Sequence, residues 1–133
     1  KNKNLVEIDN SLLLKGKQII VIESEFCPYC AKFRETVLSS YKGTVPLTYR
    51  FASQLTGLNI KTETWATPTV LFLENGNEIY GKQGYMDTEA FYKILGLFKC
   101  FKLSPAKKNS LCMINDAPKS KSFALLISGA NLS

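Results

Sequence analysis

The sequence contains no histidine among its 133 residues and no long apolar run. The absence of imidazole excludes Cys-His and Ser-His catalytic pairs, imidazole metal ligands and the usual proton carrier near neutral pH. The apolar runs stay well below the roughly 18 residues of a membrane span, so we expect no stable membrane insertion. The length and the 45% apolar composition predict one globular domain with its own core.

Acidic residues are scarce near the C-terminus. Residues 99–133 hold six lysines and the single acid Asp116, whereas residues 1–98 are nearly neutral. The basic segment lacks arginine and its two phenylalanines lie far apart, so we interpret its charge as a solvated surface and expect no nucleic-acid partner. We therefore predict a domain at 1–98 and a basic C-terminal extension at 99–133.

Short apolar runs predict the strands. Residues 19–22 (IIVI) form a continuous run, as in a strand buried on both faces of a sheet, and residues 47–51 alternate. Residues 69–73 form another apolar run. The Asn75-Gly76 pair then supplies the chemistry of a hairpin turn, which predicts a return strand at 78–82.

Helical spacing follows the first strand and also ends the domain. Phe33, Val37 and Tyr41 recur at four-residue steps, which predicts a helix that Gly43 closes. Residues 54–60 are compatible with a short helix. Asp87 is the expected N-cap of the last helix, whose apolar face would hold Phe91, Ile94, Leu95 and Phe98. The order of elements predicts an α/β fold, with a central mixed β-sheet flanked by helices.

Two of the four cysteines lie at the junction of the first strand and helix, in the stretch SEFCPYC. The Cys27-Pro28-Tyr29-Cys30 spacing is compatible with a structural staple, half of a zinc site, or a redox dithiol. A four-cysteine zinc site would need Cys100 and Cys112, whose spacing is not that of a second metal-binding pair. We expect no metal.

A dithiol at this junction would divide the chemistry between its two thiols. Cys27 would lie in the first helical turn, where unpaired N–H groups and the helix dipole stabilise a thiolate. Pro28 suits that turn because it has no N–H to satisfy. Cys30 lies one turn later and is suited to resolving the mixed disulfide that Cys27 forms.

Two motifs carry a resemblance to the thioredoxin superfamily. Residues 19–22 followed by SEFCPYC resemble its active-site strand and helix, and Trp65–Thr69 (WATPT) falls where that family has its cis-proline loop. Asn75-Gly76 and Gly84-Tyr85 follow at similar positions, so the resemblance covers about residues 5–98. It implies a thioredoxin fold and a thiol-disulfide oxidoreductase that needs no cofactor.

The resemblance also implies roles for the loops beside the dithiol. Pro28, Tyr29, Thr67 and Pro68 would bind substrate, with the Thr67 backbone paired to it. Val21 stands where the family usually has a buried aspartate, which leaves Glu23 as a candidate proton relay. Trp65 either lines the substrate groove or packs as a core residue or loop anchor.

The branch of the family is suggested by the threonine before the proline. Thr67 resembles secreted bacterial thioredoxin-like proteins, including disulfide isomerases and the SoxW-like group, which implies a periplasmic or otherwise exported protein, with a cytoplasmic one as the alternative. Tyr29 cannot supply the charge that histidine gives strong oxidants, so we favour a reductase or isomerase of protein disulfides, served by a redox partner protein.

Two other functions remain open. The Cys-Pro-Tyr-Cys motif also occurs in glutaredoxins, whose proline loop reads Thr-Val-Pro, but Thr44-Val45-Pro46 lies too soon after Cys30 and we interpret it as coincidental. A glutathione-dependent reductase is the second hypothesis, and a thioredoxin-fold binding module without catalysis is the third.

The remaining pair, Cys100 and Cys112, is a candidate structural disulfide of the extension. Closing such a loop would contribute about 3 kcal/mol on the chain-entropy estimate. The chain opens on Lys1 without an initiator methionine or a signal-type apolar stretch, which we interpret as a mature or trimmed chain. The oligomeric state is not predicted.

Overall fold

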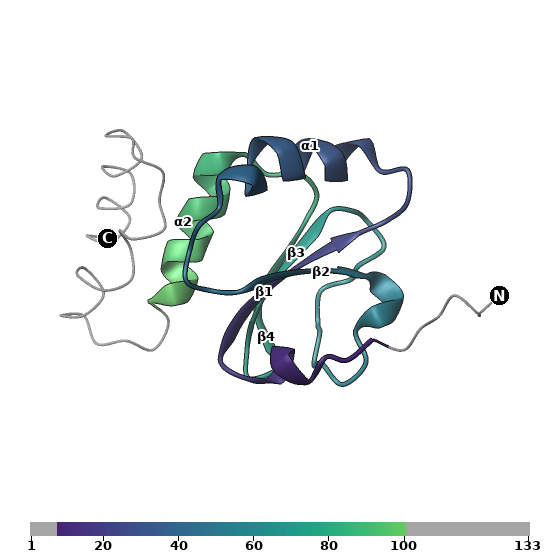
Figure 1. Ribbon diagram of the computed structural model, residues 1–133, viewed down its shortest axis with the longest axis vertical. Coiled ribbons are helices and arrows are strands. Elements are labelled where there is room, and N and C mark those ends of the chain that lie inside the picture. Colours follow the sequence, from purple (N-terminus) through teal and green to yellow (C-terminus); the bar gives the residue numbers. More distant parts are fainter. Residues whose placement is uncertain (1–7, 101–133) are drawn as a thin grey trace. The chain divides into compact units, whose positions relative to one another are not determined.

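The computed structural model describes residues 8–100 (Figure 1). The described chain forms two compact units, a sheet unit of residues 8–30 and 45–84 and a helical unit of residues 31–44 and 85–100. The strands are β1 (Lys17–Glu23), β2 (Leu47–Phe51), β3 (Thr69–Glu74) and β4 (Asn77–Gln83). The α-helices are α1 (Pro28–Thr36), which begins in the sheet unit and ends in the helical unit, and α2 (Thr88–Lys99).

The four strands form one mixed sheet in the order β2-β1-β3-β4. β1 is parallel to β2, while β3 is antiparallel to both β1 and β4. This topology confirms the predicted α/β class with a mixed sheet. Because Ile22 pairs with Thr69, the residues that follow β1 and the residues that precede β3 meet at the same end of the sheet.

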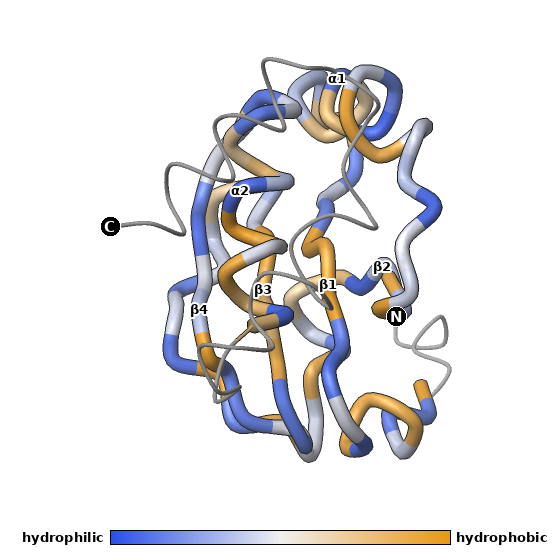
Figure 2. The backbone as a smooth tube through the Cα atoms, turned by 90° about the vertical axis from the view of Figure 1, so that its left-hand side faces the viewer, coloured by the Kyte–Doolittle hydropathy of each residue, from blue (hydrophilic) through white to orange (hydrophobic). Residues whose placement is uncertain are grey.

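The centre of the sheet is apolar because β1 and β3 are both inner strands. Ile19–Ile22 and Val70–Leu73 have no exposed surface, and both segments are orange in Figure 2. Three partly buried residues of the connection between β2 and β3 pack against one cluster of buried residues: Leu55, Leu58 and Ile60. Burial at this level stabilises each large aliphatic side chain by about 2 kcal/mol.

The helix considered for residues 54–60 is wrong. A short 3-10 turn, η4, covers Ala52–Gln54, and the chain then turns through Gly57, whose φ of 89° lies in the left-handed region. A helix cannot continue through that conformation. The apolar residues of this segment pack on the sheet from an irregular loop instead.

The predicted hairpin between β3 and β4 has the two-residue turn that its sequence indicates. Asn75 and Gly76 both have positive φ, at 54° and 84°, which is the pattern of a type I′ turn. The Asn75 backbone N–H donates to the Gly16 carbonyl at 2.9 Å, and its side-chain Oδ1 accepts from the Gly16 N–H at 2.8 Å. These two hydrogen bonds therefore hold the turn against Gly16, the residue just before β1.

Helix α1 is shorter than predicted. The α-helix ends at Thr36, and a 3-10 turn at Leu38–Ser40 follows before the chain reaches Gly43. Hydroxyls explain the early end: Thr36 Oγ1 donates to the Lys32 carbonyl at 2.7 Å and Ser39 Oγ to the Glu35 carbonyl at 2.6 Å. Such bonds compete with the helical N–H donors.

Most of the apolar residues predicted for the two helices are buried, although Ile94 is only half-buried, and Val37 and Tyr41 lie beyond the end of α1. The Asp87 side chain caps α2 by accepting from the Ala90 N–H at 2.9 Å. The Phe91 ring meets Phe33 and Tyr41 edge to face, with centroids 6.0 Å apart in both pairs. Within residues 8–100, neither α-helix reaches the length and apolarity that a bilayer crossing requires.

Candidate functional site

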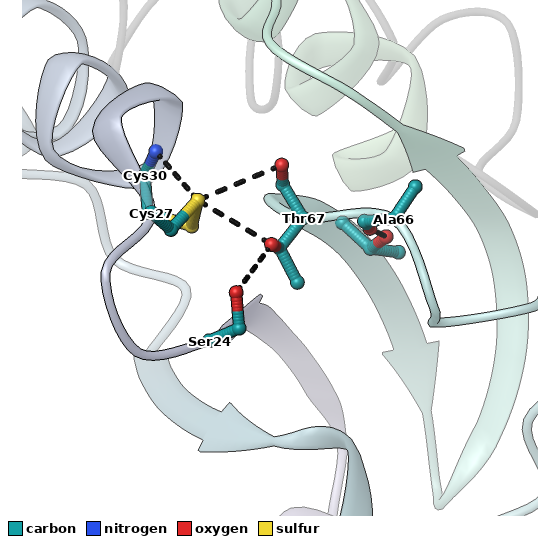
Figure 3. The surroundings of a disulfide bond; sticks show 6 residues. Ser24, Cys27, Cys30, Ala66 and Thr67 are labelled. Carbon is teal, nitrogen blue, oxygen red and sulfur yellow. Dashed lines mark hydrogen bonds between the residues drawn. A yellow bond between two sulfur atoms is a disulfide. The ribbon is translucent and has the colours of Figure 1, made fainter.

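The cysteine pair and the proline loop lie together at one end of the sheet (Figure 3). Cys27, which directly precedes α1, and Cys30, in the first turn of that helix, form a disulfide. Thr67 and Pro68 immediately precede β3, and the peptide bond between them is cis. The antiparallel pairing of β1 with β3 is what brings these two segments into contact.

The Cys27 sulfur lies among polar groups. The Cys30 N–H donates to Cys27 Sγ at 3.1 Å, as expected of an unpaired donor in the first helical turn. Thr67 Oγ1 lies 3.3 Å from the same sulfur, and the Thr67 carbonyl oxygen lies 3.7 Å away. The N–H and the hydroxyl both favour a thiolate at Cys27 once the disulfide is reduced.

The two cysteines differ in exposure. Cys27 is half-buried, whereas Cys30 is only 5% exposed. Between them, Pro28 is exposed and the Tyr29 ring is 62% exposed. An incoming disulfide can therefore reach Cys27 more readily than Cys30.

Ser24 is a site residue to which the sequence analysis gave no role. Its Oγ lies 2.7 Å from Thr67 Oγ1, and Thr67 Oγ1 in turn contacts Cys27 Sγ. The three residues form a continuous chain of hydrogen-bonding groups (Figure 3). A serine after a strand carries no sequence signal of its own, so only the fold reveals this contact.

The proline loop is held in place from both sides. The Gly84 N–H donates to the Pro68 carbonyl at 2.7 Å, and Thr69 Oγ1 donates to the Ala66 carbonyl. Further back, the Gln83 side chain donates to the Glu63 carbonyl at 2.7 Å. These bonds leave Thr67 little freedom to move away from Cys27.

A buried carboxylate anchors the segment that leads into this loop. Glu78 is 9% exposed and accepts from the backbone N–H groups of Lys61 and Thr62, at 2.7 and 2.8 Å, and from the Thr62 hydroxyl. Burying a carboxylate is costly unless it is well hydrogen-bonded, and this one is. Its sequence context gave no indication of the role.

The other residues that the sequence singled out differ in burial and position. Glu23 ends β1 and lines a groove together with Thr67, and its role as a proton relay stays a prediction. Val21, which occupies the family's usual aspartate position, is fully buried in β1. Trp65 is 76% exposed, so it does not pack in the core; it lines the groove, and its contact with substrate stays a prediction.

The remaining motifs lie away from these contacts. Pro46 precedes β2, where its carbonyl accepts from the Ile19 N–H at 2.9 Å, and within residues 8–100 the Thr67–Pro68 bond is the one cis peptide. Cys100 ends α2 and is 3% exposed, whereas Cys112 lies outside the described residues. The Cys100–Cys112 disulfide and the basic extension therefore stay predictions. Across residues 8–100, no three metal-binding side chains come together.

The comparisons with known proteins agree with this geometry. The sequence profile described as a thioredoxin-like domain matches residues 8–99. Among solved structures, the reduced periplasmic thioredoxin SoxS from Paracoccus pantotrophus superposes with a TM-score of 0.53 at 20% identity, over 62% of this chain and 94% of that one. Curated protein sequences yielded no match. The Cys27–Cys30 pair on this fold supports a thiol-disulfide oxidoreductase in the general sense, and the profile match over most of the chain shows that the protein belongs to the thioredoxin-like domain family.

Proposed function

We propose that the protein reduces or isomerises disulfide bonds in polypeptide substrates, with Cys27 as the attacking thiol and Cys30 as the resolving thiol. The observation that carries this proposal is the environment of Cys27 Sγ, with the Cys30 N–H at 3.1 Å, the Thr67 hydroxyl at 3.3 Å and an exposed surface around it. Cys30 is nearly buried, which suits attack from within the protein.

The reaction begins from the reduced dithiol. The Cys27 thiolate attacks one sulfur of the substrate disulfide, that S–S bond breaks, and the second substrate sulfur leaves as a thiolate that takes up a proton. The product is a mixed disulfide between Cys27 and substrate. Its substrate backbone would lie against Thr67 and Pro68, with the exposed Pro28 and Tyr29 on the other side of the sulfur.

The second step releases the substrate. Cys30 loses its proton and its thiolate attacks Cys27 Sγ, which breaks the mixed disulfide and frees the remaining substrate thiolate. Two electrons pass from the dithiol to the substrate, and the Cys27–Cys30 disulfide seen in the structure is the oxidised product. A dithiol partner protein would restore the reduced pair. In isomerisation, a different substrate thiolate instead attacks the substrate sulfur of the mixed disulfide, which forms a new substrate disulfide and releases Cys27 as a thiolate.

The direction of electron flow follows from what surrounds the pair. The sequence has no histidine to stabilise the Cys27 thiolate as strong oxidants do, so we expect a reducing pair. The reduction potential, measured by equilibration with dithiothreitol, should lie nearer to thioredoxin at about −270 mV than to the oxidant DsbA at about −120 mV. A value near the second figure would contradict a reductase.

The catalytic test is insulin reduction with dithiothreitol as the electron source. Cys27→Ser should lose activity completely, and Cys30→Ser should accumulate a mixed disulfide through Cys27 that mass spectrometry detects. Glu74→Gln, at the opposite end of β3, serves as the control and should keep full activity. A rate no higher than that of dithiothreitol alone, equal in the parent protein and both cysteine variants, would instead indicate a binding module, and strict dependence on glutathione would indicate a glutaredoxin-like reductase.

An exported location is part of the proposal. It is supported by the similar fold of a protein described as a periplasmic thioredoxin, and by the even number of cysteines in the chain. Fractionation of the cells that produce it, followed by detection with an antibody, tests this directly. Recovery of the protein only with cytoplasmic markers would contradict export.

A further inference from the structure

An open groove borders the Cys27 site. It has a volume of about 500 Å³ and is lined by three segments of the sheet unit: the end of β1, the residues after β2, and the loop before β3. Ser24 and Thr67 belong both to this groove and to the hydrogen-bonded chain that reaches Cys27 Sγ. A substrate held at Cys27 therefore lies beside the groove.

The groove combines carboxylates with exposed aromatic rings. Glu23 and Glu25 line it, none of its lining residues is basic, and Glu25 is exposed. Phe51 is 44% exposed and Trp65 is 76% exposed. These are the two kinds of group that bind a guanidinium or ammonium ion, one through its charge and the other through the face of its ring.

The Trp65 side chain is oriented by a hydrogen bond along its edge. Its indole N–H donates to Glu63 Oε1 at 2.9 Å, which occupies the donor without covering the ring. The indole offers its face to solvent with little side-chain freedom to lose on binding, which favours a cation–π contact.

We propose that this groove is a substrate subsite for a basic side chain, arginine or lysine, next to the cysteine that reacts with Cys27. This inference rests on the proposed function and names the class of substrate. Neighbouring residues of an extended chain are 3.8 Å apart at Cα. A long basic side chain adjacent to the bound cysteine can thus reach a groove that starts at Thr67, which itself contacts the sulfur.

A second groove beside the first one lacks the excess of negative charge that would favour a basic side chain. It is about 440 Å³ in volume and is lined by residues that include Trp65, Glu63 and Lys82. The charges of its one acid and its one base cancel, so this second groove attracts neither a positive nor a negative side chain. The acidic groove at Glu23 and Glu25 therefore distinguishes a basic substrate residue from a neutral one.

The test uses short peptides that differ at one residue beside a single cysteine. That cysteine is disulfide-linked to a chromogenic aromatic thiol, whose release reports attack by the reduced enzyme. Arginine, its neutral isostere citrulline, and glutamate are compared on either side of the cysteine. Each rate is divided by the rate with dithiothreitol, which removes the effect of peptide charge on intrinsic reactivity. We expect kcat/KM to be about five-fold higher for arginine than for citrulline at low salt.

Variants locate the preference within the groove. The arginine-to-citrulline ratio should fall close to one in the Glu23→Gln/Glu25→Gln double variant and should be reduced in Trp65→Ala, while Glu74→Gln should keep it. Because the ratio compares two peptides on the same enzyme, a general loss of activity at Glu23 cancels. Raising the salt concentration should also lower the ratio.

The outcomes separate this inference from the proposed function. Equal rates for arginine and citrulline, with both peptides turned over, would overturn the basic subsite and leave the oxidoreductase intact. A preference that survives the double substitution would overturn the assignment to this groove. Failure to attack any of the peptides would count against the proposed function itself.

Discussion

At the Glu74 end of β3 the chain reverses within two residues, whereas at the Thr69 end it arrives through the long loop that follows β2. The first end is held by a local turn, Asn75-Gly76, and its contacts to Gly16. The second end is not closed by such a tight turn and depends on tertiary contacts, namely Gly84 on Pro68 and Ser24 on Thr67. The chemistry lies at the second end, where an irregular loop can present a backbone carbonyl and a hydroxyl to a sulfur.

The largest effect is expected where the loop leading to the site is anchored. A Cβ at Gly81 would collide with the Thr62 hydroxyl and the Glu78 carboxylate. Gly81→Ala should therefore disrupt the three hydrogen bonds to Glu78 and lower the free energy of unfolding by about 3 kcal/mol, because a buried carboxylate would lose its donors. Urea denaturation measures this change.

A second variant tests whether the collision at the Glu78 anchor causes this loss of stability. Thr62→Ala removes the hydroxyl oxygen, which is the nearest of the three colliding atoms, so the cost of Gly81→Ala measured in that background should be smaller than in the parent protein. An unchanged cost would show that the strand, and not the Glu78 carboxylate, is sensitive to the added methyl group.

A glycine substitution also tests the hairpin end of β3, opposite the end that carries the site. Gly76 has a φ of 84°, where a side chain is strained, and its Cβ would meet only the mobile end of the Leu14 side chain. Gly76→Ala should lower the free energy of unfolding by about 1 to 2 kcal/mol. Insulin reduction below the unfolding transition should remain at the parental rate. A loss of activity there would break the distinction between the two ends.

Thr67 tests the site end without disturbing its packing. Thr67→Val keeps the shape of the side chain and removes the hydroxyl that lies 3.3 Å from Cys27 Sγ. In the reduced protein, alkylation of Cys27 by iodoacetamide near neutral pH should slow about five-fold, since the thiolate loses one donor. Thr67→Ser should retain most of the rate, and an equal slowing in both variants would rule out the hydroxyl as the cause.

Ser24→Ala should have the smallest effect. Ser24 Oγ contacts the Thr67 hydroxyl at 2.7 Å and does not itself reach the sulfur, so it acts by orienting Thr67. We expect about a two-fold slowing of Cys27 alkylation. In a Thr67→Val background the substitution should change nothing further. A full two-fold effect in that background would indicate that Ser24 acts on Cys27 by another route.

Local signals explain which elements could be predicted. The runs at 19–22 and 69–73, the Asn75-Gly76 turn and the Asp87 cap each depend on nearest neighbours along the chain, and the structure contains all four. The irregular segment after β2 could not be predicted, because its apolar residues pack against a cluster formed by other parts of the chain.

The residues of the site also divide into those that the sequence predicts and those that it does not. The Cys27–Cys30 spacing is readable in the sequence because thiolate chemistry favours a helix start. The Thr67-Pro68 motif is readable only through its resemblance to the proline loop of the thioredoxin superfamily. The Ser24 contact, the Glu78 anchor and the exposure of Trp65 are not readable, because each involves the packing or solvation of segments far apart in the chain.

The sequence by itself determined the strands, the turn, the helix cap and the two cysteines, because these follow from backbone preference and apolar periodicity. Only the tertiary structure decided that Thr67 would lie against Cys27 and that Glu23, Glu25, Phe51 and Trp65 would share one groove. The physical reason is the antiparallel pairing of β1 with β3, which joins segments about forty residues apart.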